Sequence, residues 1–194
     1  ADMRTHLDHL FGGYLDGHHD GRVELSWTET SPDDAGRYRL RHACFFGTDQ
    51  LDELVEEAAR LNAQPMCNVY VGAALRHPDT PPFGRARDDD FGAAMALWCD
   101  LDSADAVQQA LANYAHAKPT LLVMTGEHPH QRVQCWWRLA EAIEDPETLR
   151  NALSGIAYKM GGDTTVTNPS RVMRLAGSIA WPHKPGRVAE LTRV

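Results

Sequence analysis

The sequence has no long uninterrupted run of apolar residues, and its N-terminus lacks a basic segment followed by an apolar one. A membrane-spanning helix needs about 20 apolar residues in succession, and a secretory signal needs both of those N-terminal segments. The sequence therefore predicts a cytoplasmic protein with neither a membrane span nor a signal peptide.

Glycine-rich nucleotide-binding loops are missing too, because neither G-x-G-x-x-G nor G-x-x-x-x-G-K-[ST] occurs. A dinucleotide-binding fold and a P-loop site are thus unsupported. Cysteine is scarce, and no C-x-x-C pair is formed by the four that occur, Cys44, Cys67, Cys99 and Cys135. This spacing does not fit a zinc site, so we expect reduced, buried thiols and no zinc.

Basic residues are outnumbered, with 19 Lys and Arg against 27 Asp and Glu, giving a net charge of −8. Taken alone, such a balance argues against a nucleic-acid partner, because neutralising phosphates needs Lys and Arg. Residues 164–194 differ, because their only acid is Glu190 and their basic residues are Arg171, Arg174, Lys184, Arg187 and Arg193. This asymmetry predicts a local anion-binding surface on an acidic body.

The pattern of apolar residues predicts alternating helices and strands after an N-terminal helix over residues 3–15 and a turn over 16–21. Strands are expected over 22–29, 37–46, 66–75, 93–102, 119–125 and 132–140, and helices over 48–62, 103–117 and 145–162. The proline-rich segment 76–90, which ends in three aspartates, predicts an exposed, solvated loop.

Two aspartates end the apolar strand "ALWCDLDS". Strand residues i and i+2 point to the same face about 6.6 Å apart, so Asp100 and Asp102 project together. Carboxylates in this arrangement can bracket two hard cations about 3.5–4 Å apart, as in phosphoryl transfer. The alternative is that Asp102 starts the next helix with Ser103, while Asp100 is solvated at the end of the strand.

A third acid, Asp163, follows two glycines and precedes Arg171, Arg174 and Lys184. A metal-bound triphosphate requires this combination, with a carboxylate on the cation and basic groups on the phosphate oxygens. The alternative reading places Arg171 and Arg174 on the surface of a helical turn.

The segments "CDLD", "TGEHPHQRVQCWWRL" and "GGDTTVTNPSRVMRLAGSIAWPHK", in this order, resemble the three motifs of the archaeo-eukaryotic primase superfamily. The chain is most similar to RepB-like plasmid and phage primases and primase-polymerases, over roughly residues 20–190. The upstream "NVYVGAALR" before a proline-rich loop is also similar to that family.

The resemblance implies an α+β fold, with a small antiparallel sheet like that of RNA-recognition domains, flanking helices and an additional N-terminal α/β element. It implies one catalytic domain over 1–194, with the N-terminal element in 1–90 and the metal-binding core in 91–194. We expect a piece of a longer protein, from which a helicase or accessory domain is missing.

The resemblance also implies primer synthesis on a single-stranded DNA template in plasmid or phage replication, from NTPs or dNTPs. Asp100, Asp102 and Asp163 would bind two Mg²⁺ or Mn²⁺ ions that activate a 3′-hydroxyl. Arg171, Arg174 and Lys184 would hold the phosphates of the nucleotide. Arg76, at the end of "NVYVGAALR", would reach the nucleotide or the template.

The middle motif departs from the family pattern, because Gln134 stands where family members usually have a histidine. Strand alternation places Arg132, Gln134 and Trp136 on one face. We expect Arg132 and Gln134 to hold the phosphates together, since arginine supplies the charge that glutamine lacks. Trp136 is the candidate for stacking on a base, although of Trp136 and its neighbour Trp137 at least one should be in the core.

Two rival functions remain open. His128 and His130 resemble the metal site of His-hydrophobic-His rolling-circle initiators, with Tyr158 as nucleophile, but Pro129 would interrupt the strand and Lys159 is misplaced. The altered middle motif alternatively fits a degenerate primase domain that serves only as a nucleic-acid-binding or regulatory module.

Overall fold

The computed structural model describes residues 1–12 and 20–194. Within them the helices are α1 (Asp2–Phe11), α2 (Leu51–Asn62), α3 (Ala104–Asn113) and α4 (Pro146–Met160), with short 3-10 helices η1 (Asp88–Asp90) and η2 (Thr164–Val166). The strands are β1 (Arg22–Thr28), β2 (Leu40–Gly47), β3 (Val69–Gly72), β4 (Leu75–Arg76), β5 (Phe91–Leu101), β6 (Leu121–Gly126), β7 (Arg132–Ile143), β8 (Val172–Arg174), β9 (Ile179–Ala180) and β10 (Glu190–Leu191). The expected turn over 16–21 lies mostly outside the described residues.

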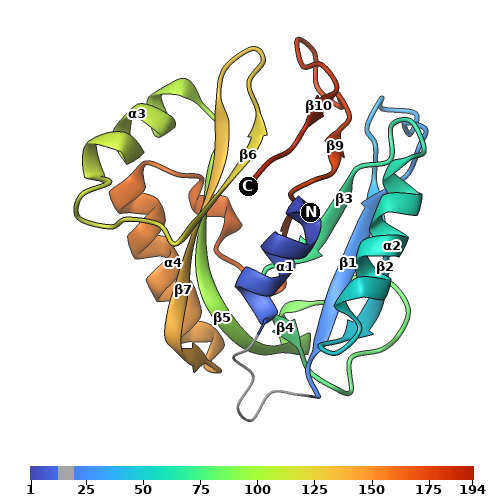
Figure 1. Ribbon diagram of the computed structural model, residues 1–194, viewed down its shortest axis with the longest axis horizontal. Coiled ribbons are helices and arrows are strands. Elements are labelled where there is room, and N and C mark those ends of the chain that lie inside the picture. Colours follow the sequence, from blue (N-terminus) through green and yellow to red (C-terminus); the bar gives the residue numbers. More distant parts are fainter. Residues whose placement is uncertain (13–19) are drawn as a thin grey trace.

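The main sheet divides into two arms. Its strand order is β6-β7-β5-β4-β1-β3-β8, with β2 on the other edge of β1, and the strand pairs within the described residues are all antiparallel. One edge of β1 is shared by β3 and β4, after which β3 pairs with β8 and β4 pairs with β5. Figure 1 shows the arms meeting at β4 and diverging from there.

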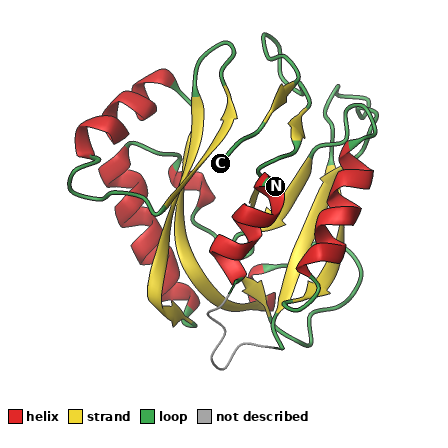
Figure 2. Ribbon diagram, viewed as in Figure 1, coloured by secondary structure: helices red, strands yellow, loops and turns green. Residues whose placement is uncertain are grey.

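The helices cover the arms on different sides. Figures 1 and 2 show α1 between the arms, α2 outside β1 and β2, and α3 and α4 outside β5–β7. The boundaries of α4 follow from local sequence, because Asp145 accepts a hydrogen bond from the Thr148 amide at 2.7 Å and Pro146 fills the first turn. The helix ends at Gly161, whose φ of 73° is the left-handed conformation that glycine adopts without strain.

Strand alternation separates the two faces of β5 and β7. In the pairing of these strands Trp98 lies opposite Trp136, and Asp100 lies opposite Gln134. Trp136 contacts His6 of α1, so this face is turned toward the space between the arms. The opposite face forms a second core with α3 and α4 from Cys99, Leu101, Val133, Cys135, Val107 and Met160. Asp100 is thereby fixed by a core on each side of its strand.

The predicted α+β class with a mostly antiparallel sheet is confirmed. The predicted parts 1–90 and 91–194 share one sheet through the pairs β4–β5 and β3–β8. All four cysteines are free, as expected, but Cys44 is only partly buried. No described helix is long and apolar enough to cross a membrane.

The expectation that residues 88–90 are a solvated loop is wrong for their conformation and for Asp88, although Asp89 is exposed. They form η1, and Asp88 accepts hydrogen bonds from the amide and hydroxyl of Ser170 at 3.0 and 2.6 Å and from Arg150 at 2.7 Å. These donors hold the pKa of Asp88 at about 2, although burial opposes them. The sequence pattern could not show this, because both partners lie far along the chain.

Candidate active site

Three carboxylates from two segments converge at the end of β5. Asp100 is in β5 and Asp102 follows its last residue, while Asp163 caps η2. The Asp163 amide donates to the Asp100 carbonyl at 3.0 Å, which sets the two residues side by side. A Cβ on Gly162 would lie 2.2 Å from Cys99 Sγ and 3.1 Å from the Asp100 carbonyl, so this approach of the α4–η2 turn to β5 requires glycine.

The pKa of Asp100 is affected by both of the other carboxylates. Burial first, then the charges of Asp102 and Asp163, raise the pKa of Asp100 to about 6, against the opposing effect of Arg171 and Arg174. Asp163 differs, because hydrogen bonds from the Thr165 amide and hydroxyl, at 2.8 and 2.7 Å, lower its pKa despite burial. Asp100 and Asp102 therefore lie near each other, as the strand spacing predicts, and their role as metal ligands stays a prediction.

The donor set of this cluster fits hard divalent cations. None of the described residues donates a hydrogen bond to the partly buried Asp100 carboxylate, which leaves its oxygens open to a cation. Asp102 already has a cationic partner, because Arg187 Nη2 donates to both carboxylate oxygens of Asp102, at 2.8 and 2.9 Å. Oxygen-only ligands suit Mg²⁺ or Mn²⁺. In this arrangement, however, the described residues contain no group of three His, Cys, Asp or Glu side chains with the geometry of a metal site.

The predicted phosphate-binding residues border the cluster. Arg171 has a buried Nε without a hydrogen-bond partner, and its pKa is lowered by burial while Asp100 and Asp163 oppose that shift. Lys184 Nζ lies 3.5 Å from an oxygen of Asp102. Both cations therefore lie near the carboxylates, and Arg171 has hydrogen-bonding capacity left for an anion.

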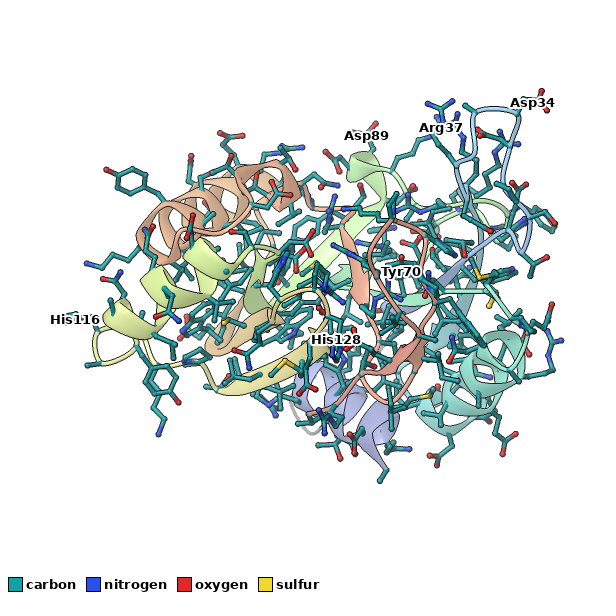
Figure 3. The ribbon with its side chains drawn as sticks, turned by 90° about the horizontal axis from the view of Figure 1, so that it is seen from above. Asp34, Arg37, Tyr70, Asp89, His116 and His128 are labelled. Carbon is teal, nitrogen blue, oxygen red and sulfur yellow. The ribbon has the colours of Figure 1, made fainter. Side chains whose placement is uncertain are left out.

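Arg174 is held by the opposite arm. Its guanidinium donates to Asn68 Oδ1 at 2.6 Å and to the Tyr70 hydroxyl at 3.1 Å, and it lies 4.8 Å from the centre of the Tyr70 ring. Figure 3 shows Tyr70 near the middle of the molecule, away from the labelled peripheral residues. Sequence reasoning missed Asn68 and Tyr70, although alternation along "NVY" does put them on one strand face.

The middle-motif residues lie beside the cluster and are engaged within the protein. Arg132 donates to Glu190 Oε2 at 3.0 Å and to the His128 carbonyl, and its Nε lies 3.9 Å from Asp102. Gln134, in the amide orientation that satisfies both of its groups, donates to the Arg174 carbonyl and accepts from the Arg174 amide, each at 3.2 Å. Gln134 thus bridges the two arms, and its phosphate contact stays a prediction.

The structure corrects two expectations. Arg76 is fully buried, where it pairs with Glu24 at 2.8 Å and donates to the carbonyls of Pro169, Ser170 and Arg171 at 2.9, 3.0 and 3.2 Å. It therefore positions the segment before β8 and does not reach a nucleotide or template.

Trp136 is also fully buried, in contact with His6 and Trp98, so it cannot stack on a base. The alternative that at least one of the paired tryptophans belongs to the core is confirmed by Trp136.

The residues of the rolling-circle alternative lie apart from one another. His128 Nδ1 is 2.9 Å from Glu190 and His130 Nε2 is 2.9 Å from the Asp102 carbonyl, so each ring is engaged within the protein. Tyr158 is 84% exposed on α4, which packs outside β5–β7. The structure does not bring the proposed nucleophile to the histidines.

No family model and no curated protein sequence matches the chain. Among solved structures, the chain is similar to the archaeo-eukaryotic primase domain of the cyanophage S-2L primase-polymerase, with a TM-score of 0.62 and 19% identity over 99% of this chain and 86% of that one. It is similar to the catalytic domain of primase RepB′ in complex with initiator DNA, with a TM-score of 0.58 and 15% identity over 98% and 84% of the two chains.

A further structure of primase RepB′ has a TM-score of 0.56 and 19% identity, with 89% of this chain covering 50% of that one. The expected fold, that of archaeo-eukaryotic primase catalytic domains, is therefore confirmed.

Proposed function

We propose that the chain catalyses template-dependent nucleotidyl transfer, synthesising primers on single-stranded DNA in plasmid or phage replication from NTPs or dNTPs. One observation carries the proposal: Asp100, Asp102 and Asp163 converge at a site bordered by Arg171 and Lys184. Support comes from the fold, which is shared with domains described as primase and primase-polymerase, one of them in complex with initiator DNA.

Each side chain has a defined task in this proposal. Asp100, Asp102 and Asp163 would hold two Mg²⁺ or Mn²⁺ ions, which when bound lower the pKa of the attacking hydroxyl and neutralise the triphosphate. Arg171 offers its unused donors to phosphate oxygens, and Lys184 adds a mobile point charge. Arg174 is the third phosphate-binding candidate, and its contacts with Asn68 and Tyr70 fix where its guanidinium can lie.

A second candidate is a degenerate, non-catalytic nucleic-acid-binding or regulatory module. The observation in its favour is that Arg187 occupies both oxygens of Asp102, and that the described carboxylates are not arranged as a metal site. Both candidates predict DNA binding, whereas only the first predicts a new phosphodiester bond.

The test is primer synthesis on a single-stranded circular DNA with labelled NTPs or dNTPs and Mg²⁺ or Mn²⁺. Wild-type protein should give labelled products, and Asp100→Asn should give none. The matched control is Asp89→Asn, the same substitution at an exposed position of η1 (Figure 3), which should retain synthesis. DNA binding by the wild type without synthesis would contradict the proposal and favour the degenerate module.

A further inference from the structure

Arg187 connects a surface hairpin to the carboxylate cluster. Strands β9 and β10 pair through Ala180 and Glu190, and residues 181–189 form the loop between them. From this loop Arg187 donates to both oxygens of Asp102, at 2.8 and 2.9 Å. The contact is partly screened from solvent, because the Arg187 side chain is 23% exposed and that of Asp102 is 38% exposed.

More positive charge surrounds Asp102 than is required to neutralise one carboxylate. Arg132, Lys184 and Arg187 all approach it, at 3.9, 3.5 and 2.8 Å. Arg132 is held elsewhere by Glu190 at 3.0 Å, but Lys184 and Arg187 have no other ion pair among the described residues. The loop therefore carries a surplus of positive charge, which is complementary to a polyanion.

A guanidinium seated on both oxygens of Asp102 excludes a divalent cation from those oxygens, through steric overlap and through charge repulsion. Binding of a metal ion at Asp102, which the proposed function requires, must therefore displace Arg187. The released guanidinium has its planar donor fork free next to the site where the phosphates would lie.

The loop is bonded to the body of the protein at its start, through Trp181 and His183, but the segment around Arg187 has few contacts that oppose this displacement. The Arg187 amide makes only a long hydrogen bond, at 3.3 Å, to the Lys184 carbonyl. The neighbouring Gly186 has a φ of 78° and nothing within 4 Å of a hypothetical Cβ, so the turn stands clear of the body of the protein. Arg132, whose side chain is only 3% exposed, has no comparable freedom.

We propose that Arg187 is a phosphate-binding residue that exchanges partners: it neutralises Asp102 in the metal-free protein and transfers to the triphosphate when a metal–nucleotide complex binds. This inference rests on the proposed function. Removal of Arg187 should raise the affinity for the metal ion, because Asp102 becomes free to bind it. The same removal should lower the affinity for the nucleotide, because the phosphates lose a donor.

The experiment measures Mn²⁺ binding without nucleotide, from the electron paramagnetic resonance signal of free Mn²⁺, and then binding of a non-hydrolysable nucleoside triphosphate at saturating Mn²⁺. Arg187→Gln should bind Mn²⁺ several-fold more tightly and the nucleotide about tenfold more weakly than wild type. Arg187→Lys, which keeps the charge but not the fork, should also bind Mn²⁺ more tightly and lose less nucleotide affinity. Arg60→Gln, which removes the partner of Glu57 on α2, outside β1 and β2, should change neither affinity.

Equal or weaker Mn²⁺ binding by Arg187→Gln would overturn the exchange, as would nucleotide affinity equal to that of the wild type. Thermal melts of each variant identify a folding defect, and Arg187→Lys then supplies the decisive comparison. Both affinities are measured without turnover. Absence of primer synthesis despite the predicted affinities would therefore refute the proposed function and leave the exchange standing.

Discussion

Replacement of Asp100 by asparagine should stabilise the metal-free protein at neutral pH. Burial, with the charges of Asp102 and Asp163, raises the pKa of Asp100 from its ordinary value of 3.8 to about 6. At about 1.4 kcal/mol for each pKa unit, the ionised carboxylate costs at most about 3 kcal/mol of folding free energy. Because Asp100 is partly exposed, solvent screening reduces the expected gain in the variant to about 1–2 kcal/mol.

The pH dependence of this gain has a defined sign. A carboxyl group whose pKa is raised by folding does not destabilise the protein below its unfolded pKa, where both states bind the proton. The cost develops as the pH rises from about 4 to about 6, the interval between the unfolded and folded pKa of Asp100, and is constant above it. The variant should therefore become more stable than the wild type as the pH rises across that interval, and the difference in unfolding free energy should stay constant above it.

Urea denaturation in the presence of a chelator, at about pH 4 and about pH 7.5, measures this difference. Asp89→Asn, exposed on η1, is the control for the substitution itself and should be neutral at both pH values. Addition of Mn²⁺ at 100 times its Kd should stabilise the wild type by about 2.7 kcal/mol and Asp100→Asn by much less. An Asp100→Asn variant that is less stable than wild type at neutral pH, or equally stabilised by Mn²⁺, would refute the reasoning.

The buried Arg76–Glu24 pair should couple strongly. Arg76→Met is expected to lower the unfolding free energy by about 3 kcal/mol, because it leaves the buried Glu24 with only the more distant Arg85, at 3.7 Å, as a cationic partner. Adding Glu24→Gln should restore part of this loss in urea denaturation. Trp136→Ala should cost about 3–5 kcal/mol through the cavity it creates, while fluorescence anisotropy of labelled single-stranded DNA shows unchanged template affinity of the folded fraction. Arg174→Ala should raise the KM for nucleotide about tenfold in steady-state synthesis, with a smaller change in template affinity.

Local patterns in the sequence are sufficient to single out the three carboxylates, whose role as metal ligands stays a prediction. Alternation along β5 places Asp100 on one strand face, and the two glycines before Asp163 allow η2 to approach that strand. Alternation along β7 puts Gln134 on one strand face with Arg132, and the structure adds that Gln134 lies opposite Asp100. These features depend on neighbours in sequence or on a regular strand, so a pattern is enough to find them.

The roles that depend on distant partners could not be predicted. The pattern around Arg76 is the same for an arginine that reaches a ligand and for one that is buried, and Glu24 on β1 decides the outcome. Trp136 and Trp137 alternate, but only the contact of Trp136 with His6 of α1 shows which one is internal. Arg187 lies in a loop without periodicity, so its contact with Asp102 appears only once β9 and β10 are paired.

The central claim is that Asp100, Asp102 and Asp163 together hold catalytic divalent cations. The most direct test is anomalous X-ray diffraction from crystals of the protein grown with Mn²⁺ and a non-hydrolysable nucleoside triphosphate. We expect two manganese peaks within coordination distance of these carboxylates, with the triphosphate near Arg171 and Lys184. Absence of any peak at the three carboxylates, with ordered nucleotide or Mn²⁺ bound elsewhere, would contradict it.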